Sequence, residues 1–298
     1  MSFPVRGQAG RREKRVRSSS VERVEVNGLE VAYERVGSGP PLVLVHGAAL
    51  DSRSWRPQLD ALADELTVVA WDEPGVGRSS VVPEGFGLAG FADALAGVVR
   101  HLGLGPAHLA GLSWGGTVVL ECWRRHPDLV ASLILMDTYA GWSGSLPADE
   151  VARRVEGVRR SLEAPAEDFD PTLPGLFGGE PSAEVVALLE EIAADVRPDT
   201  LALELGIMAA TDLSDLLPEI DVPTLLVWGE LDSRSTLEVA RRFEADIDGS
   251  ELVVVEGAGH VSNLEQPHVV NEAIREFCRR RTAGERRPRQ DSNLQPTD

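Results

Sequence analysis

The ten residues AHLAGLSWGG, at positions 107–116, decide the fold of this chain. They begin as an apolar strand, Ala107–Leu112, and continue into a helical pattern, Trp114–His126. Ser113 lies between the two in a G-x-S-x-G motif, which carries catalytic meaning when it joins a strand to a helix. The sharp turn leaves no room for side chains two positions before and after the serine, and both positions are glycine. We therefore predict that Ser113 is a nucleophile.

Apolar runs alternate with helical patterns on both sides of this stretch. Asn27-Gly28 joins the first two strands and is typical of a two-residue hairpin turn. The predicted strands are Val21–Val26, Leu29–Val36, Leu42–Val45, Thr67–Trp71, Ala107–Leu112, Leu133–Met136, Thr224–Trp228 and Glu251–Val255, and the helices between them are 56–65, 88–102, 114–126, 236–247 and 267–280. This alternation predicts an α/β fold with a mostly parallel sheet covered by helices on both faces.

The pattern changes between the sixth and seventh strands. Residues 138–220 contain no strand-like run, and Pro/Gly-rich connections join their helical stretches, which are Glu150–Leu162, Ala183–Ala194 and Thr200–Ala210. We therefore predict an inserted helical cap. The expected organisation is a disordered basic N-terminus, a core in two parts, the cap and a disordered C-terminal tail, at 1–20, 21–137 with 221–280, 138–220 and 281–298.

A serine hydroxyl needs a base to remove its proton, and His260 is the best placed histidine. It follows the strand Glu251–Val255 in a Gly-Ala-Gly-His loop, so it should reach the same edge of the sheet as Ser113. The carboxylate that orients the imidazole is expected to be Asp232, just past the strand Thr224–Trp228, with Glu230 as the alternative. The order Ser113, Asp232, His260 is that of the α/β-hydrolase triad.

Acyl transfer also needs hydrogen-bond donors for the developing oxyanion. One should be the backbone N–H of Trp114, at the start of a helix, and the other that of Ala48, with Ala49 as second choice. His46, Gly47 and the turn DEPGVGRS at 72–79 are expected to shape the site rather than touch the substrate.

Composition limits the partners. The chain has 298 residues and a net charge of −19, although its first twenty residues hold six basic side chains and its last twenty hold six arginines. An acidic body disfavours binding to nucleic acid and to anionic membranes. No apolar run is long enough for a membrane span or a secretory signal, and the two cysteines are expected to be reduced and buried, which predicts a cytoplasmic protein. Homodimer formation is left open.

Five segments together resemble the α/β-hydrolase superfamily: HGAALDSRSW, WDEPGVGRSS, GLSWGG, PTLLVWGELD and GAGHVSNLEQP. The resemblance covers residues 21–280. It implies a sheet of eight strands, a lid between strands six and seven, and acyl-enzyme chemistry without a metal or an organic cofactor. GHVSNLEQP is similar to the segment around the catalytic histidine of 3-oxoadipate enol-lactonases, whereas DEPGVG differs from their turn. Haloalkane dehalogenases and epoxide hydrolases use an aspartate nucleophile, which Ser113 argues against.

The expected function is hydrolysis of an ester or lactone of a small molecule. Proline iminopeptidase-like or C–C bond hydrolase activity uses the same triad and stays open, as does a non-catalytic small-molecule receptor. Ala49 is a candidate for substrate contact. Side chains of the insertion can line an apolar pocket or pack the helices, namely Trp142, Phe169, Phe177, Leu203 and Met208. Arginines for an anionic substrate are available nearby, at Arg153, Arg154, Arg159, Arg160 and Arg234, although arginines on a helix often form a solvated face.

Overall fold

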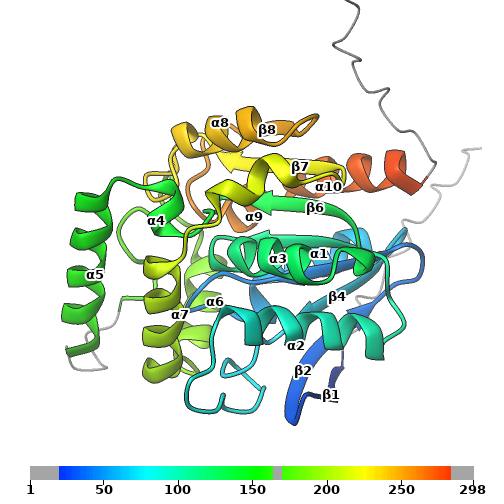
Figure 1. The fold of residues 1–298 in the computed structure, drawn as a ribbon, viewed down its shortest axis with the longest axis horizontal. Coiled ribbons are helices and arrows are strands. Elements are labelled where there is room, and N and C mark those ends of the chain that lie inside the picture. The colour runs from blue at the N-terminus through cyan, green and yellow to red at the C-terminus, as the bar shows by residue number, and fades with distance from the viewer. Residues whose placement is uncertain (1–19, 164–169, 283–298) are drawn as a thin grey trace, which may run out of the picture.

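The computed structural model describes residues 20–163 and 170–282. Nearly all of the two predicted disordered ends, and Phe169 of the insertion, lie outside these ranges. Eight strands form one sheet in the order β1-β2-β4-β3-β5-β6-β7-β8 (Figure 1). The strands are β1 Val21–Val26, β2 Leu29–Val36, β3 Pro41–Val45, β4 Thr67–Trp71, β5 Ala107–Leu112, β6 Val130–Met136, β7 Thr224–Gly229 and β8 Glu251–Val255.

The sheet is antiparallel only at its N-terminal edge. Strand β1 pairs with β2 through a turn in which Asn27 and Gly28 both have positive φ, 52° and 79°, as the Asn-Gly sequence predicts. Strand β2 pairs antiparallel with β4, and every later pairing is parallel. In register, Leu112 lies beside Met136 and Gly229 beside Val255. The loops that follow these strands therefore meet at one edge of the sheet.

Helices cover both faces of the sheet, as the alternation of patterns predicts. On one face, side chains of α2, α3 and α8 form a hydrophobic core with the strands, and on the other face α1 and α10 do so (Figure 1). These helices are α1 Arg56–Leu62, α2 Leu88–His101, α3 Trp114–Arg125, α8 Leu237–Asp246 and α10 Pro267–Thr282. Helix α1 ends three residues earlier than expected. Cys122 and Cys278 are buried without a disulfide, and burial raises the pKa of each thiol to about 12.

A helical insertion, defined here as residues 138–220, connects β6 to β7. It lies at the left of Figure 1, beyond the ends of the parallel strands. Its described helices are α4 Trp142–Ser145, α5 Ala148–Glu163, α6 Ala183–Ala193, α7 Pro198–Ala210 and the 3-10 helix η4 Ser214–Glu219. The three longer ones match the predicted helical stretches. Further short helices outside the insertion are η1 Ser52–Trp55, η2 Pro127–Leu129 and α9 Ser262–Glu265.

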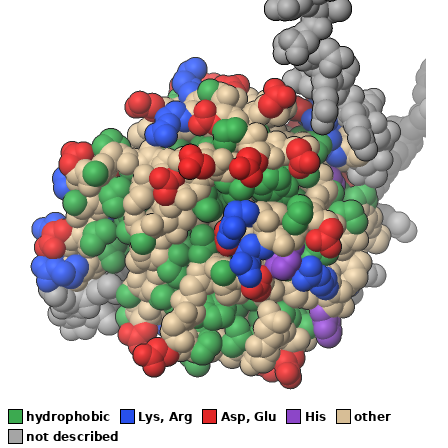
Figure 2. Space-filling view, viewed as in Figure 1, with side chains coloured by type: hydrophobic (Ala, Val, Ile, Leu, Met, Phe, Trp, Pro, Cys, Tyr) green, Lys and Arg blue, Asp and Glu red, His purple; other side chains and the backbone are tan. Residues whose placement is uncertain are grey.

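The surface carries the acidic excess that the composition predicts. The sequence has 48 acidic and 29 Lys or Arg side chains, and Figure 2 shows acidic groups scattered over the visible face with basic ones in smaller groups. Within the described ranges, no helix combines the length and the apolar character that crossing a bilayer requires.

Candidate active site

Ser113 occupies a strained backbone position between β5 and α3. Its φ and ψ are 52° and −117°, a conformation that costs a non-glycine residue about 1–3 kcal/mol. Two hydrogen bonds hold it there: the Ser113 N–H donates to the Met136 carbonyl at 2.9 Å, and the Thr138 hydroxyl donates to the Ser113 carbonyl at 2.5 Å. A Cβ at Gly111 would clash with the carbonyl of Gly115, which explains why glycine is needed before the turn.

His260 lies against Ser113. Its Nε2 is 2.8 Å from Ser113 Oγ and its Nδ1 is 2.8 Å from Asp232 Oδ2. With its proton on Nδ1, the imidazole donates to Asp232 and accepts from the serine hydroxyl. The His260 backbone N–H donates to the carbonyl of Leu176, at 2.9 Å, so the insertion helps to hold this loop.

Of the two candidate carboxylates, Asp232 is the one that contacts His260. Its other oxygen, Oδ1, accepts the backbone N–H groups of Arg234 and Ser235, at 2.8 and 2.9 Å. Glu230, the alternative, is exposed and accepts the N–H of Gly257 at 3.1 Å. The loop after β7 thus turns the Asp232 carboxylate toward the imidazole and the Glu230 carboxylate away from it.

Asp137, which the sequence reasoning missed, links the ends of β6 and β7 to the start of α9. It follows β6, has a φ of 46°, and accepts the Gly229 N–H at 2.7 Å and the Ser262 hydroxyl at 2.6 Å. Complete burial and the nearby charge of Asp232 raise the pKa of Asp137 well above its usual value. Its position directly after the predicted strand Leu133–Met136 indicates that it lies at the site, because the carboxyl ends of parallel strands meet at the same edge of the sheet.

The candidate oxyanion donors, Ala48 and Trp114, carry unused N–H groups. Trp114 is the first residue of α3, where an N–H has no intrahelical acceptor, and in the described part of the chain neither group donates elsewhere. Ala48 lines the same pocket as Ser113. The N–H of Ala49, the second choice, lies against the carboxyl of Glu204 instead, where it lowers the pKa of that group.

His46 shapes the loop that holds Ala48, as expected. Its buried ring donates from Nδ1 to the Gly47 carbonyl at 2.9 Å and accepts the Glu73 N–H at Nε2, at 3.2 Å. Burial lowers the pKa of His46, and the neutral ring that this favours is the form that makes both bonds.

Two buried carboxyl groups meet behind this loop. Glu73, from the DEPG turn, accepts the Trp114 indole N–H at 2.9 Å, and Glu204, from α7, approaches it from the insertion. Burial raises the pKa of Glu204 to about 7, and burial together with Glu204 raises that of Glu73 well above its usual value. Their contact joins the insertion to the core directly beside Trp114.

A pocket between the sheet edge and the insertion contains Ser113 and His260. Of the residues proposed for substrate binding, Ala49, Trp142 and Met208 line it, whereas Phe177 and Leu203 do not. Apolar side chains that the sequence reasoning did not single out also line it, namely Leu112, Leu173, Leu176, Leu189 and Leu205. Tyr139 contributes too, and burial raises its pKa to about 12.

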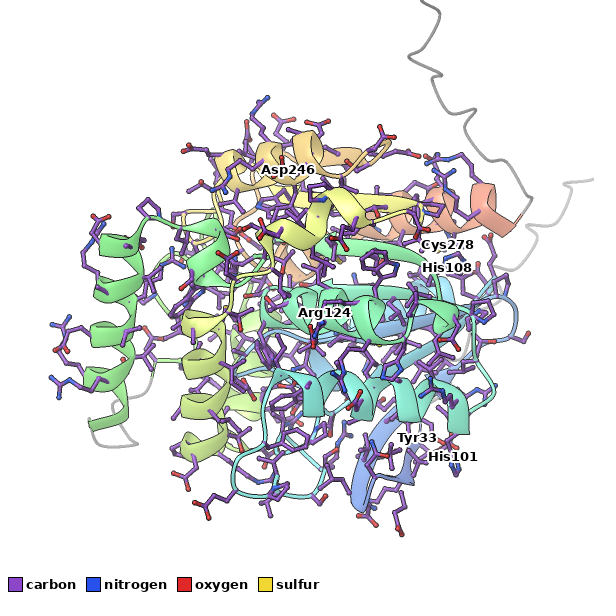
Figure 3. All side chains as sticks on the ribbon, viewed as in Figure 1. Tyr33, His101, His108, Arg124, Asp246 and Cys278 are labelled. Atoms are coloured by element: carbon purple, nitrogen blue, oxygen red, sulfur yellow. The ribbon has the colours of Figure 1, made fainter. Side chains whose placement is uncertain are left out.

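The other histidines lie elsewhere. Figure 3 shows His101 and His108 on the side of the molecule away from the insertion. His108 Nδ1 is 2.7 Å from the Ser132 hydroxyl, and burial lowers its pKa to about 4. Among the residues that the structure describes, no group of three His, Cys, Asp or Glu side chains has an arrangement that could hold a metal ion.

The chain belongs to the α/β-hydrolase family, and it is an enzyme of the hydrolase type. The sequence model of the Alpha/beta hydrolase family matches residues 42–273. An esterase structure from Thermogutta terrifontis, described as malate-bound, is 33% identical with a TM-score of 0.74, covering 88% of this chain and 99% of that one. The Burkholderia xenovorans enol-lactonase structure is 26% identical, with a TM-score of 0.69 over 87% of this chain and all of the other.

A curated relative broadens the range of reactions. The (E)-2-((N-methylformamido)methylene)succinate hydrolase of Acinetobacter baylyi is 27% identical over 252 residues, which make up 83% of this chain and 94% of the relative. The resemblance to enol-lactonase-like members is therefore confirmed at the level of the superfamily, in which esterase and lactonase neighbours stand beside other hydrolases.

Proposed function

We propose that this chain hydrolyses an ester or lactone of a small molecule through Ser113, His260 and Asp232. The observation that carries the proposal is the continuous pair of 2.8 Å contacts, from Ser113 Oγ to His260 Nε2 and from His260 Nδ1 to Asp232 Oδ2. The apolar pocket around Ser113 supports a small, partly apolar substrate. The likeness to an esterase and an enol-lactonase supports the same chemistry.

The reaction follows from the positions of these groups. Ser113 Oγ attacks the carbonyl carbon while His260 Nε2 takes the hydroxyl proton, and Asp232 stabilises the imidazolium that forms. The N–H groups of Ala48 and Trp114 hold the oxyanion. The imidazolium then gives its proton to the leaving alcohol. A water molecule attacks the acyl-enzyme by the same route, and the acid leaves as Ser113 regains its proton.

Amide hydrolysis is the second candidate, because the Acinetobacter baylyi relative is named for a substrate that carries an N-methylformamido group. The same residues would then protonate a leaving nitrogen. Initial rates on matched 4-nitrophenyl esters and 4-nitroanilides of the same acids decide between the two activities. The ester assignment requires the enzyme's ester-to-anilide rate ratio to exceed the ratio for uncatalysed hydrolysis of the same two compounds.

The test of the nucleophile is Ser113→Ala. We expect ester hydrolysis to fall by roughly three orders of magnitude or more, with loss of covalent labelling by a fluorophosphonate. The control is Ser80→Ala, because the one hydrogen bond of the Ser80 hydroxyl to a described residue is accepted from the Glu30 N–H, at 3.1 Å. Wild-type protein that is folded yet neither labelled nor active on any ester would instead indicate a receptor.

A further inference from the structure

The five arginines near the insertion differ in what they face. Three lie on the exposed side of α5 and pair with carboxylates of their own helix, namely Arg153 with Asp149 and Glu150, and Arg159 and Arg160 with Glu156. Basic groups are visible at the left edge of Figure 2, where α5 lies. Arg154 and Arg234 instead line the pocket that contains Ser113 and His260.

Arg154 is held firmly. Its Nε donates to Glu150 at 2.7 Å, one Nη to the Tyr139 hydroxyl at 3.0 Å and the other to the Arg234 carbonyl at 2.8 Å. The guanidinium also stacks over the rings of Tyr139 and Trp142, with its central carbon 5.6 and 5.5 Å from their centroids. These contacts fix a positive charge at the pocket wall and anchor the backbone of Arg234.

The guanidinium of Arg234 has no such partners. Among the described residues, no side chain or carbonyl accepts a hydrogen bond from it. The groups around it are Tyr139, Arg154 and Asp232, and the Asp232 oxygens are already occupied by His260 and two backbone N–H groups. The Arg234 side chain is partly buried, and this burial lowers its pKa.

The described pocket lining holds no carboxylate for Arg234, and Glu150, which pairs with Arg154, lies outside the lining. The lining contains two guanidiniums and no Asp or Glu, although the chain as a whole has a net charge of −19. An arginine presents five donors in a plane that matches a carboxylate, so a bound carboxylate would satisfy Arg234. Apolar side chains line the pocket between, and they suit a short hydrocarbon linker.

We propose that Arg234, backed by Arg154, binds a carboxylate of the substrate, so that the preferred substrates are esters or lactones carrying a second, ionised carboxylate. This proposal rests on the proposed function, because it assigns the substrate class of the same site. The half-esters of short dicarboxylic acids are the simplest members of the class.

The test compares 4-nitrophenyl half-esters of succinic, glutaric and adipic acid with neutral 4-nitrophenyl esters of matched chain length. We expect the wild-type protein to have a higher kcat/KM for at least one half-ester than for its neutral match. Arg234→Gln should lower that ratio by roughly 10- to 100-fold, mainly through KM, as expected for loss of a charge-assisted hydrogen bond. Arg234→Lys, which keeps the charge but not the planar fork, should give an intermediate ratio.

Arg153→Gln is the matched control, because Arg153 is exposed on the same helix as Arg154, and its ratio should equal that of the wild type. A wild-type preference for the neutral esters, or a ratio that Arg234→Gln leaves unchanged, overturns the proposal. Binding of glutaric acid monomethyl ester to Ser113→Ala, measured by calorimetry, tests the subsite without chemistry. Binding that Arg234→Gln abolishes supports the subsite even if no ester is hydrolysed, whereas absence of binding overturns it.

Discussion

Asp232 and Glu230 are two residues apart, yet only one of them contacts the imidazole of His260. Asp232→Asn keeps the shape of the side chain but exchanges an acceptor for a donor, which disfavours the tautomer with a proton on Nδ1. We expect kcat for ester hydrolysis to fall by roughly three to four orders of magnitude. Glu230→Gln should stay within about twofold of the wild type, since Glu230 is exposed. Steady-state rates of the two variants, with circular dichroism as the check on folding, decide whether the carboxylate is correctly assigned.

Asp137 stabilises the sheet edge without touching His260. Asp137→Ala would leave the Gly229 N–H and the Ser262 hydroxyl without their acceptors in a buried place, which costs about 1–3 kcal/mol in the free energy of unfolding. Asp137→Asn can still accept one bond and should cost less, because its raised pKa favours the neutral form of Asp137 in any case. Urea unfolding measures both, with the exposed Asp221→Ala as the control. Equal losses for Ala and Asn would argue that the charge itself is needed.

At the scale of elements, the contact of Glu204 in α7 with Glu73 makes the attachment of the insertion sensitive to pH. An unfolded glutamate titrates near pH 4.5, whereas the pKa of buried Glu204 is raised to about 7. Between these values the unfolded chain releases a proton that the folded chain keeps, so stability falls as pH rises through this window. The loss is on the order of 3 kcal/mol above pH 7, since one pKa unit corresponds to about 1.4 kcal/mol.

Glu204→Gln removes this ionisation and lets an amide N–H donate to Glu73. We expect Tm to rise by several degrees at pH 8 and to change little at pH 5. Thermal unfolding at the two pH values measures the difference, and Glu190→Gln, an exposed change on α6, serves as the control. An equal change of Tm at pH 5 and pH 8 would show that ionisation of Glu204 does not control the stability of the protein.

The elements themselves could be predicted to a large extent. Strands buried on both faces have short apolar runs, and their ends determine where Ser113, Asp232 and His260 lie, because parallel strands end together. The insertion could not be predicted to the same depth. A helical pattern over 200–210 places Glu204 in a helix, but its contact with Glu73 depends on how α7 docks. Phe177, a candidate for the pocket, packs outside the lining. It lies in a connection between helices, where no periodicity indicates which side chains face inward, so its position could not be predicted.

At the scale of the whole molecule, the large net negative charge affects the stability of the fold. The net charge of −19 makes the surface groups repel one another, and this repulsion is greatest in the compact folded state. Salt reduces it, because the Debye length shortens from about 30 Å at 0.01 M to about 8 Å at 0.15 M. Salt also weakens exposed ion pairs such as Arg153–Glu150 and Arg159–Glu156, but each contributes only about 0–1 kcal/mol.

The repulsion should therefore outweigh the exposed pairs, while partly buried pairs such as Arg78–Asp72 are screened less. We expect Tm to rise by a few degrees between about 0.01 M and 0.15 M NaCl. Sucrose at matched osmolarity is the control, because it does not screen charge. A Tm that falls with NaCl would show that local ion pairs, and not the net charge, dominate the electrostatic contribution to folding. The acidic surface would then cost little stability.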